Sequence, residues 1–269
     1  CTALFKSPCQ NACPVEMDIP SYIALIREGR LDDAYKVMLR TNPFPSVCGR
    51  VCDHKCQFKC RRGKMDEPIA IKFLKRFISD NAARPKVEAV PVTRNEKIAV
   101  VGAGPAGLTA ARDLAIRGYK VTVFEELSEP GGMLRWAIPS YRLPRDILAG
   151  EIDDVRALGV EIKCKKRVGR DIPFAKLEKE FDYIYLAPGA HKSQKMGVPG
   201  EELKGVYGGV EFLRDFNAHE TAWTTGKKNL GSKVAVIGGG NSAIDAARCA
   251  VRLDANVTIL YRRERKDMP

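Results

Sequence analysis

The chain has 269 residues, of which 45% are hydrophobic, and its formal net charge is +12. This composition is typical of a soluble globular protein large enough for two domains, and it excludes disordered and fibrous classes. No apolar run approaches the length of a membrane-spanning helix and no secretory signal is visible, so we expect a cytoplasmic protein without a membrane span.

The positive charge does not indicate a nucleic-acid partner. Lysine and arginine are spread along the chain, and the densest clusters, KCKKR and YRRERK, are short. A solvated basic surface is the simplest interpretation. A sharper interpretation is that the charge binds phosphate-bearing cofactors or an acidic redox partner.

The N-terminal region shows mainly helical periodicity. Helices are predicted over residues 19–29 and 31–40. A third helix, over residues 68–82, starts with proline and carries one broad apolar stripe. The stripe consists of Ile69, Phe73, Leu74, Phe77 and Ile78. Residues 83–96 are rich in proline and poor in periodicity, which predicts a linker.

Seven of the nine cysteines lie in this region, and four of them stand four residues apart in CGRVCDHKCQFKC. Thiolates are soft ligands, and iron–sulfur clusters take four of them or nearly so. Structural zinc is a rival interpretation, although the spacing fits zinc knuckles poorly. Disulfides are another, but they require an oxidising compartment. The remaining Cys164 and Cys249 are expected to be small apolar core residues.

A first dinucleotide fingerprint begins at Lys97, in KIAVVGAGPAGLTAARDLAIRGYKVTVFEE. It combines a buried strand, a G-x-G-x-x-G turn, a helix and a second strand that ends in an acid. The glycines permit a tight turn and close approach of a pyrophosphate to the helix N-terminus. The terminal acid can accept hydrogen bonds from a ribose hydroxyl. The predicted contacts are Gly102, Gly104, Pro105, Ala106, Gly107 and Glu125.

A second fingerprint begins at Lys233, in KVAVIGGGNSAIDAARCAVRLDANVTILYRRERKDMP. Alanine takes the third glycine position, and arginines replace the terminal acid. Arginine there suits the 2′-phosphate of NADP, which a carboxylate would repel, so NADPH is predicted rather than NADH. The alternative is that the arginines only solvate a strand end. The predicted contacts are Gly238, Gly240, Asn241, Ser242, Ala243, Arg262 and Arg263.

Two such sites in one chain resemble the flavoproteins in which an NAD(P)H domain is inserted into an FAD domain. The segment EPGGMLRWAIPSYRLP is similar to the one that runs beside the flavin in the glutamate synthase small-subunit family. FDYIYLAPGA resembles the second FAD-side motif of that family, with Pro188 where threonine is usual. The resemblance implies a set of flavin neighbours, which are Gly131, Gly132, Met133, Leu134, Arg142 and Gly189.

The cysteine segments resemble the helical N-terminal domain of the same family, shared with dihydropyrimidine dehydrogenase and bifurcating NADPH:ferredoxin oxidoreductases. That resemblance implies a 4Fe-4S cluster, whose predicted ligands are Cys13, Cys52, Cys56 and Cys60. The second cluster of the family would use positions that are Cys1, Leu4, Cys9 and Lys75 here. Leucine cannot ligate and a lysine ammonium has no lone pair, so one cluster is predicted. A second stays open, with Cys1, Cys9 and Cys48 as its candidates.

The expected fold is therefore α/β. An all-α 4Fe-4S domain over residues 1–94 precedes the first half of an FAD domain over 95–228 and the N-terminal part of an inserted NADPH domain over 229–269. Both dinucleotide units are expected to be Rossmann-like, the last incomplete. The chain starts without methionine, and the glycine–aspartate pair that closes the family's FAD domain would follow Pro269, so a longer protein is expected.

The function implied is that of an NADPH-dependent FAD and iron–sulfur oxidoreductase subunit. It would pass electrons to or from a larger catalytic or ferredoxin-like redox subunit. Hydride transfer between NADPH and a flavin needs no side-chain nucleophile, so no catalytic residue is assigned. Two alternatives stay open: a non-catalytic electron-transfer or assembly module, and a bifurcating NADPH:ferredoxin oxidoreductase subunit.

Overall fold

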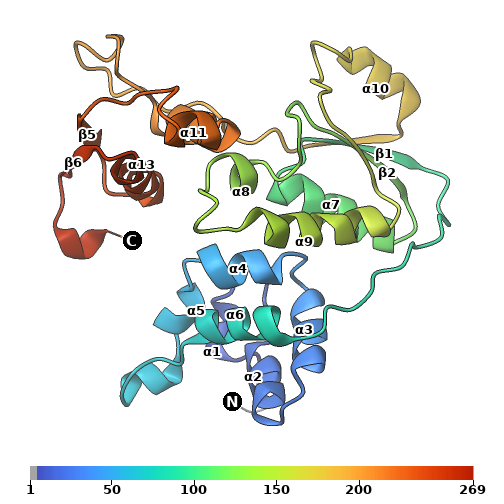
Figure 1. The fold of residues 1–269 in the computed structure, drawn as a ribbon. Helices are drawn as coiled ribbons and strands as arrows, with labels where there is room; N and C mark the ends of the chain where they lie inside the picture. Colours follow the sequence, from blue (N-terminus) through green and yellow to red (C-terminus); the bar gives the residue numbers. More distant parts are fainter. Residues whose placement is uncertain (1–4, 269) are drawn as a thin grey trace.

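The computed structural model describes residues 5–268, with a helical N-terminal part below an α/β part (Figure 1). Of the candidate ligands, Cys1 lies outside the described residues. The helical part contains α1 (Pro8–Asn11), α2 (Ile19–Arg27), α3 (Leu31–Leu39), α4 (Pro45–Val51), α5 (Lys55–Phe58), the 3₁₀ helix η1 (Arg61–Lys64) and α6 (Ile71–Asn81).

Local sequence explains how α2 begins and what it buries. Asp18 caps the helix, accepting the backbone N–H of Ser21 at 3.3 Å and its hydroxyl at 2.7 Å. Tyr22 on α2 and Met38 on α3 are completely buried, because the two helices pack face to face. This core holds the segments that carry the first cysteines.

The apolar stripe expected on the third long helix differs from the face that α6 buries. The buried residues are Ile71, Lys75 and Ile78, whereas 65% of Phe73 and 45% of Phe77 is exposed. A stripe of five residues covers so much of a helix surface that its pattern cannot decide which edge faces the core. The neighbour decides: α6 packs on α4, where a Cβ on Gly49 would lie 2.9 Å from the Cα of Arg76.

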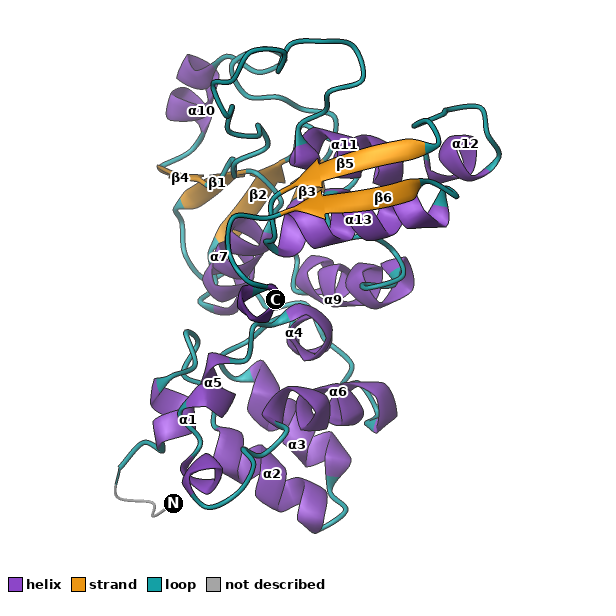
Figure 2. Ribbon diagram, turned by 90° about the vertical axis from the view of Figure 1, so that its left-hand side faces the viewer, coloured by secondary structure: helices purple, strands orange, loops and turns teal. Residues whose placement is uncertain are grey.

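The α/β part is built on one parallel sheet in the order β3-β2-β1-β4 (Figure 2). The hydrophobic pattern of the first fingerprint forms β1 and β2 as predicted, with α7 between them. The bounds of the elements are β1 (Lys97–Val101), α7 (Pro105–Ile116), β2 (Lys120–Phe124), α8 (Met133–Trp136), α9 (Arg145–Ala157), β3 (Glu161–Lys163), α10 (Phe174–Glu180) and β4 (Tyr183–Leu186).

The second fingerprint forms a smaller unit with a two-stranded parallel sheet, β5-β6. The helix of this unit that follows the glycine turn, α13, packs on α11. Helix α11 also contacts α8 of the first unit. Phe212, Phe216 and Trp223 form an aromatic cluster against that helix. The elements are α11 (Gly209–Ala218), α12 (Glu220–Thr224), β5 (Lys233–Ile237), α13 (Asn241–Arg252), β6 (Asn256–Leu260) and the 3₁₀ helix η2 (Arg265–Asp267).

The helical and α/β parts meet where α4 packs on α9 (Figure 1). Glu151 of α9 is buried and accepts the backbone N–H groups of Ser46 at 2.6 Å and Val47 at 3.2 Å, in the first turn of α4. Phe44 and Val47 belong to the same hydrophobic cluster as β1 and α7. The contact is therefore a packed junction with a polar centre.

The segment between α6 and β1 has no regular secondary structure, as the linker prediction requires. It is nevertheless anchored to the α/β part. Arg84 pairs with Asp154 at 2.6 Å, and the N–H of Thr93 bonds the carbonyl of Gly118 at 2.9 Å. Across residues 5–268, no helix combines the length and the apolar character that crossing a bilayer requires.

Candidate functional site

The first glycine turn joins β1 to α7, and at two of its glycines no other residue fits. A Cβ on Gly102 would lie 2.2 Å from a backbone carbonyl oxygen of the loop after β4, and one on Gly107 would lie 1.9 Å from the carbonyl of Gly102. Gly104 is the N-cap of α7, followed by Pro105 and Ala106. The first turn of α7 thus has its N–H groups available for an anion.

Glu125 follows β2 at the same edge of the sheet. Its buried carboxylate accepts the N–H of Ala103 at 2.8 Å through Oε2 and the N–H of Leu127 at 2.8 Å through Oε1. The carboxylate therefore holds the glycine turn in shape. A carboxylate has about four acceptor positions, so this one retains capacity for a ribose hydroxyl.

The segment expected beside the flavin lies directly on the first turn. Gly131 donates its N–H to the carbonyl of Ala103 at 2.8 Å. A Cβ on Gly132 would lie 2.7 Å from the Cα of Gly104, so the two backbones touch. The next two candidates, Met133 and Leu134, are partly buried at the start of α8.

The loop after β4 completes this edge. Pro188 lies against Gly102, because a Cβ on that glycine would be 3.3 Å from the proline Cα. Gly189 has a φ of 72°, a conformation that glycine adopts readily, and lies beside the ring of His191. Residues from both FAD-side motifs therefore gather around the first turn.

Arg142, for which the resemblance implied a flavin contact, forms an ion pair within the chain. Its guanidinium pairs with the carboxylate of Asp245 on α13 at 2.5 Å. Only 5% of the Asp245 side chain is exposed, and its Oδ1 has no hydrogen-bond partner among the described residues. The adjacent Tyr141 ring lies 3.7 Å from the guanidinium of Arg252, also on α13. The flavin-side segment is thus tied to the helix of the second glycine turn.

The second turn has alanine at its third glycine position, and Ala243 lies close to the first glycine of the turn. A Cβ on Gly238 would lie 3.4 Å from the Cβ of Ala243, an ordinary van der Waals contact. Gly238 has a φ of 125°, and Gly240 is the N-cap of α13. The exposed Asn241 and Ser242 form the first residues of that helix.

Arg262 and Arg263 follow β6 and are exposed. Within the described part of the chain, neither side chain forms an ion pair or hydrogen bond. The preceding Tyr261 packs on the second turn, since a Cβ on Gly239 would lie 2.6 Å from its ring. Both arginines therefore follow directly after a residue that contacts the turn, and their guanidinium N–H groups are free to bind a phosphate.

Cysteines pack in the same buried cluster as one tyrosine of the helical part: Cys56 belongs to the cluster of Tyr22, and Cys9 and Cys13 lie against it. Tyr22 is completely buried, and its hydroxyl has no hydrogen-bond partner among residues 5–268. Burial raises the pKa of Tyr22, and the charges of Cys56, Cys13, Cys9 and Cys52 raise it further. Three of these thiols are predicted ligands, and Cys9 is a further candidate.

A buried cation lies beside the same thiols. Burial raises the pKa of Cys56 to about 11, Lys75 opposes that rise, and Cys52 and Cys13 add to it. Lys75 is only 6% exposed and also acts on Cys48, whose pKa is raised by burial. The lysine therefore occupies the interior, where it can offset the charge of an anionic group.

The donors present fit an iron–sulfur cluster better than the rival interpretations. All eight described cysteines are free thiols. Within residues 5–268, no three His, Cys, Asp or Glu side chains converge closely enough to bind a single metal ion. Zinc draws its sulfurs to about 2.3 Å, whereas four irons spread their thiolates further apart. The unpaired Tyr22 hydroxyl is a donor from which an anionic cluster can accept a hydrogen bond.

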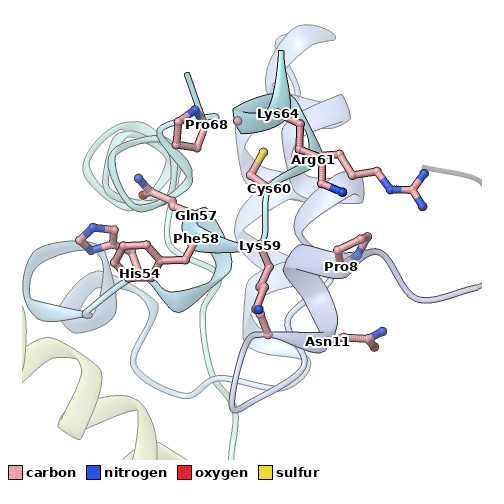
Figure 3. A pocket seen from close by; sticks show the side chains of 12 residues that line it. Pro8, Asn11, His54, Gln57, Phe58, Lys59, Cys60, Arg61, Lys64 and Pro68 are labelled. Carbon is pink, nitrogen blue, oxygen red and sulfur yellow. The ribbon is translucent and has the colours of Figure 1, made fainter. Parts of the chain in front are cut away.

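Cys60 lies in the wall of an open cavity of about 950 Å³ (Figure 3). Ala12, the neighbour of Cys13, lines the same cavity. Basic side chains contribute to the wall: Lys59, Arg61 and Lys64. The fourth predicted ligand is thus close to solvent and surrounded by positive charge.

Three residues of this architecture were not assigned from the sequence. Tyr22 follows the helical periodicity of its segment, which predicts a core position but not an unpaired hydroxyl. Asp245 is a lone acid within the apolar face of its helix, which is a usable signal for a buried ion pair. Glu151 has no local signal, because its partners lie about a hundred residues away in the chain. Cys249 is fully buried as expected, while Cys164 is only partly buried.

Comparison with known families divides the chain in the same way. Residues 1–87 match the family described as dihydropyrimidine dehydrogenase domain II, 4Fe-4S cluster. Residues 96–266 match the pyridine nucleotide-disulphide oxidoreductase family. The second match covers more than half of the chain.

Two curated relatives extend along nearly the whole chain. The β subunit of NADP(+)-dependent formate dehydrogenase from Moorella thermoacetica is 45% identical, over 98% of this chain and 40% of its own length. The glutamate synthase [NADPH] small chain of Escherichia coli is 34% identical, over 100% of this chain and 59% of its own length. The chain thus spans less than two thirds of either relative.

A solved structure of 2-naphthoyl-CoA reductase, in complex with 2-naphthoyl-CoA, shares the fold. It has a TM-score of 0.55 and 24% identity, and the match covers 92% of this chain and 33% of that one. The helical and α/β parts are therefore found together in a known architecture. With the cysteine-rich helical part and the glycine turns on one chain, the protein belongs to the pyridine nucleotide-disulphide oxidoreductase family, in its glutamate synthase small chain-like group of FAD and 4Fe-4S proteins.

Proposed function

We propose that this protein moves electrons between NADPH, FAD and one 4Fe-4S cluster, as part of a β-type subunit that serves a separate catalytic partner. The observation that carries the proposal is the contact between Arg142 and Asp245. It joins the helix of the second glycine turn to the segment that continues from the first, so two dinucleotides bound there would share one junction. When bound, NADPH and FAD supply the hydride chemistry, and the chain binds and orients them.

FAD is proposed at the first turn and NADPH at the second. The first site would use the α7 N-terminus and Glu125, with Gly132, Met133, Leu134 and Gly189 beside the flavin. The second would use the α13 N-terminus, with Arg262 and Arg263 on the 2′-phosphate. Exposed, unpaired guanidinium groups next to that turn support NADPH over NADH.

The cluster is proposed on Cys13, Cys52, Cys56 and Cys60. Cys13 and Cys56 pack in the Tyr22 cluster, and the charges of Cys52 and Cys13 raise the pKa of Cys56. Cys60 lines the basic cavity. Lys75 buried beside them supports a single cluster, because an ammonium cannot replace the missing ligand of a second. Cys9 and Cys48 are then left as packing or vestigial residues.

The partner is proposed to be a larger catalytic or ferredoxin-like redox subunit with an acidic docking face. Both relatives are named as subunits, and both names include NADP or NADPH. The basic wall around Cys60 supports docking close to the proposed cluster. The proposed divisions of the chain are residues 1–94, 95–228 and 229–269, supported by the linker before β1 and the start of β5 at Lys233.

An anaerobic titration of the purified complex with NADPH tests the proposal. We expect flavin absorbance to bleach first and a reduced-cluster signal to follow in low-temperature electron paramagnetic resonance. Iron and acid-labile sulfide should each be about four per chain. The same titration with NADH should need more reductant, because NADH has no 2′-phosphate for the two arginines to bind.

Two outcomes would contradict the proposal. A bound flavin that NADPH does not reduce would remove the dehydrogenase assignment and leave an electron-transfer module. About eight irons per chain would contradict the single cluster and bring Cys9 and Cys48 into a second one.

A further inference from the structure

Tyr22 has a hydroxyl group that the core of the helical part does not satisfy. The side chain is 0% exposed, and its oxygen has no hydrogen-bond partner among the described residues. Folded proteins rarely leave a buried hydroxyl unpaired, because it has lost water without gaining a partner. An unpaired buried donor therefore points to a ligand that accepts from it.

The surroundings of the hydroxyl identify that ligand's chemistry. Tyr22 shares a buried hydrophobic cluster with Cys56, and Cys9 and Cys13 pack against that cluster. The charges of these three thiols and of Cys52 raise the pKa of Tyr22. They come from α1, from the turn after it, and from the α4–α5 region, so they approach Tyr22 from separate parts of the chain. Whatever these cysteines bind would be anionic and sulfur-rich, and it would lie within reach of the phenol.

The second buried tyrosine of the helical part shows what a satisfied phenol looks like in the same core. Tyr35 is 2% exposed, and its hydroxyl interacts with the side chain of Ser46. The charged groups that act on its pKa are Glu151, Arg84 and Asp154. The unpaired state of Tyr22 is thus specific to the cysteine side of the core.

We propose that the Tyr22 hydroxyl donates an O–H···S hydrogen bond to the iron–sulfur cluster held by these cysteines and raises its reduction potential; this inference rests on the cluster of the proposed function. Reduction adds negative charge to the sulfurs, so a donor stabilises the reduced form more than the oxidised form. The N–H of His54, 3.3 Å from the Cys52 sulfur, is a second donor of this kind. Tyr22 is a tuning residue and not a ligand.

The test compares Tyr22→Phe with Tyr35→Phe in the anaerobically purified holoprotein. Each variant removes one buried hydroxyl from the same core. Only Tyr22→Phe removes the hydroxyl that lies on the cysteine side. Iron and sulfide analysis is followed by a redox titration monitored by electron paramagnetic resonance. We expect unchanged iron content in both variants, a more negative midpoint potential for Tyr22→Phe, and an unchanged midpoint for Tyr35→Phe.

A second variant covers the case in which Tyr22→Phe fails to retain its cluster. A fluorinated tyrosine with a more acidic hydroxyl, incorporated at position 22, keeps the shape and strengthens the donor. It should shift the midpoint to more positive values. Loss of the cluster from Tyr22→Phe together with this positive shift would support the proposal.

The outcomes separate this inference from the proposed function. A wild-type protein with about four irons whose midpoint does not respond to either change at position 22 would overturn the hydrogen bond and leave the function intact. An equal shift in Tyr35→Phe would also overturn it, because general core polarity would then be the cause. A wild-type protein without iron would overturn both.

Discussion

The same position in two glycine turns has different requirements in this molecule. Gly107 has no space for a methyl group, because the carbonyl oxygen of Gly102 would be 1.9 Å away. At the equivalent point of the second turn stands Ala243, and a Cβ added to Gly238 would lie 3.4 Å from its methyl group. The first turn therefore requires glycine at this position, whereas the second turn accommodates the alanine methyl group.

Gly107→Ala should abolish FAD binding and destabilise the α/β part. Overpacking of this kind costs about 1–3 kcal/mol, and the displaced turn would no longer offer its N–H groups to the pyrophosphate. The flavin-to-protein ratio and thermal unfolding measure both effects. The control is Gly209→Ala, where no atom lies within 4 Å of an added Cβ. Full flavin content in Gly107→Ala would contradict the prediction.

At the scale of elements, residues of one part of the chain cap or anchor helices of another part. The first turn of α4 has no side-chain cap of its own, and Glu151 of α9 supplies the acceptor. Helix α13 contacts the segment before α9 in two ways. Asp245 pairs with Arg142, and the guanidinium groups of two arginines lie over the ring of Tyr141. These contacts, rather than helix propensity, set how the elements are placed.

Asp245→Asn should loosen α13 from the flavin-side segment. The substitution removes the charge that pairs with Arg142, and charged hydrogen bonds of this kind contribute about 1.5–3 kcal/mol. Faster hydrogen exchange in α13 and slower flavin reduction by NADPH are expected. The control is Asp153→Asn, whose pair with Arg156 is exposed and worth about 0–1 kcal/mol. Equal exchange in both variants would argue against the contact as a junction.

On the scale of the whole molecule, the junction between the helical and α/β parts contains a titrating group. Burial raises the pKa of Glu151 to about 7, although the N–H groups of Ser46 and Val47 and the charge of Arg84 act against the rise. The other titratable groups near it are Tyr35 and Cys48. A carboxyl that loses its proton only as the pH passes about 7 makes the junction sensitive to pH.

The junction should weaken as pH rises from about 4.5 to above about 7. The folded state holds the Glu151 proton more tightly than the unfolded state, so its stability is greatest below the unfolded pKa and falls as pH passes the folded pKa. The loss from this group is roughly 3 kcal/mol at most. Thermal unfolding across that range should show a slope that Glu151→Gln removes and that Glu178→Gln, on an exposed site, retains. An unchanged slope in Glu151→Gln would rule out this group as the cause.

The sequence by itself determined the two glycine-turn units, the long N-terminal helices and the cofactor classes. Both glycine fingerprints form strand–turn–helix–strand units as predicted, because the tight turns depend on local backbone freedom. The cysteine spacing and its resemblance predicted the 4Fe-4S family that the comparisons show. Such signals are local, so they survive without knowledge of the fold.

Only the tertiary structure decided which residues meet. Three contacts join residues from different elements: the Arg142 and Asp245 pair, the Glu151 cap on α4, and the packing of cysteines in the Tyr22 cluster. The α6 face that is buried, with Lys75 in place of Phe73, was likewise set by packing on α4. Burial and pairing depend on the neighbours that the chain brings together in space, and no local pattern encodes those neighbours.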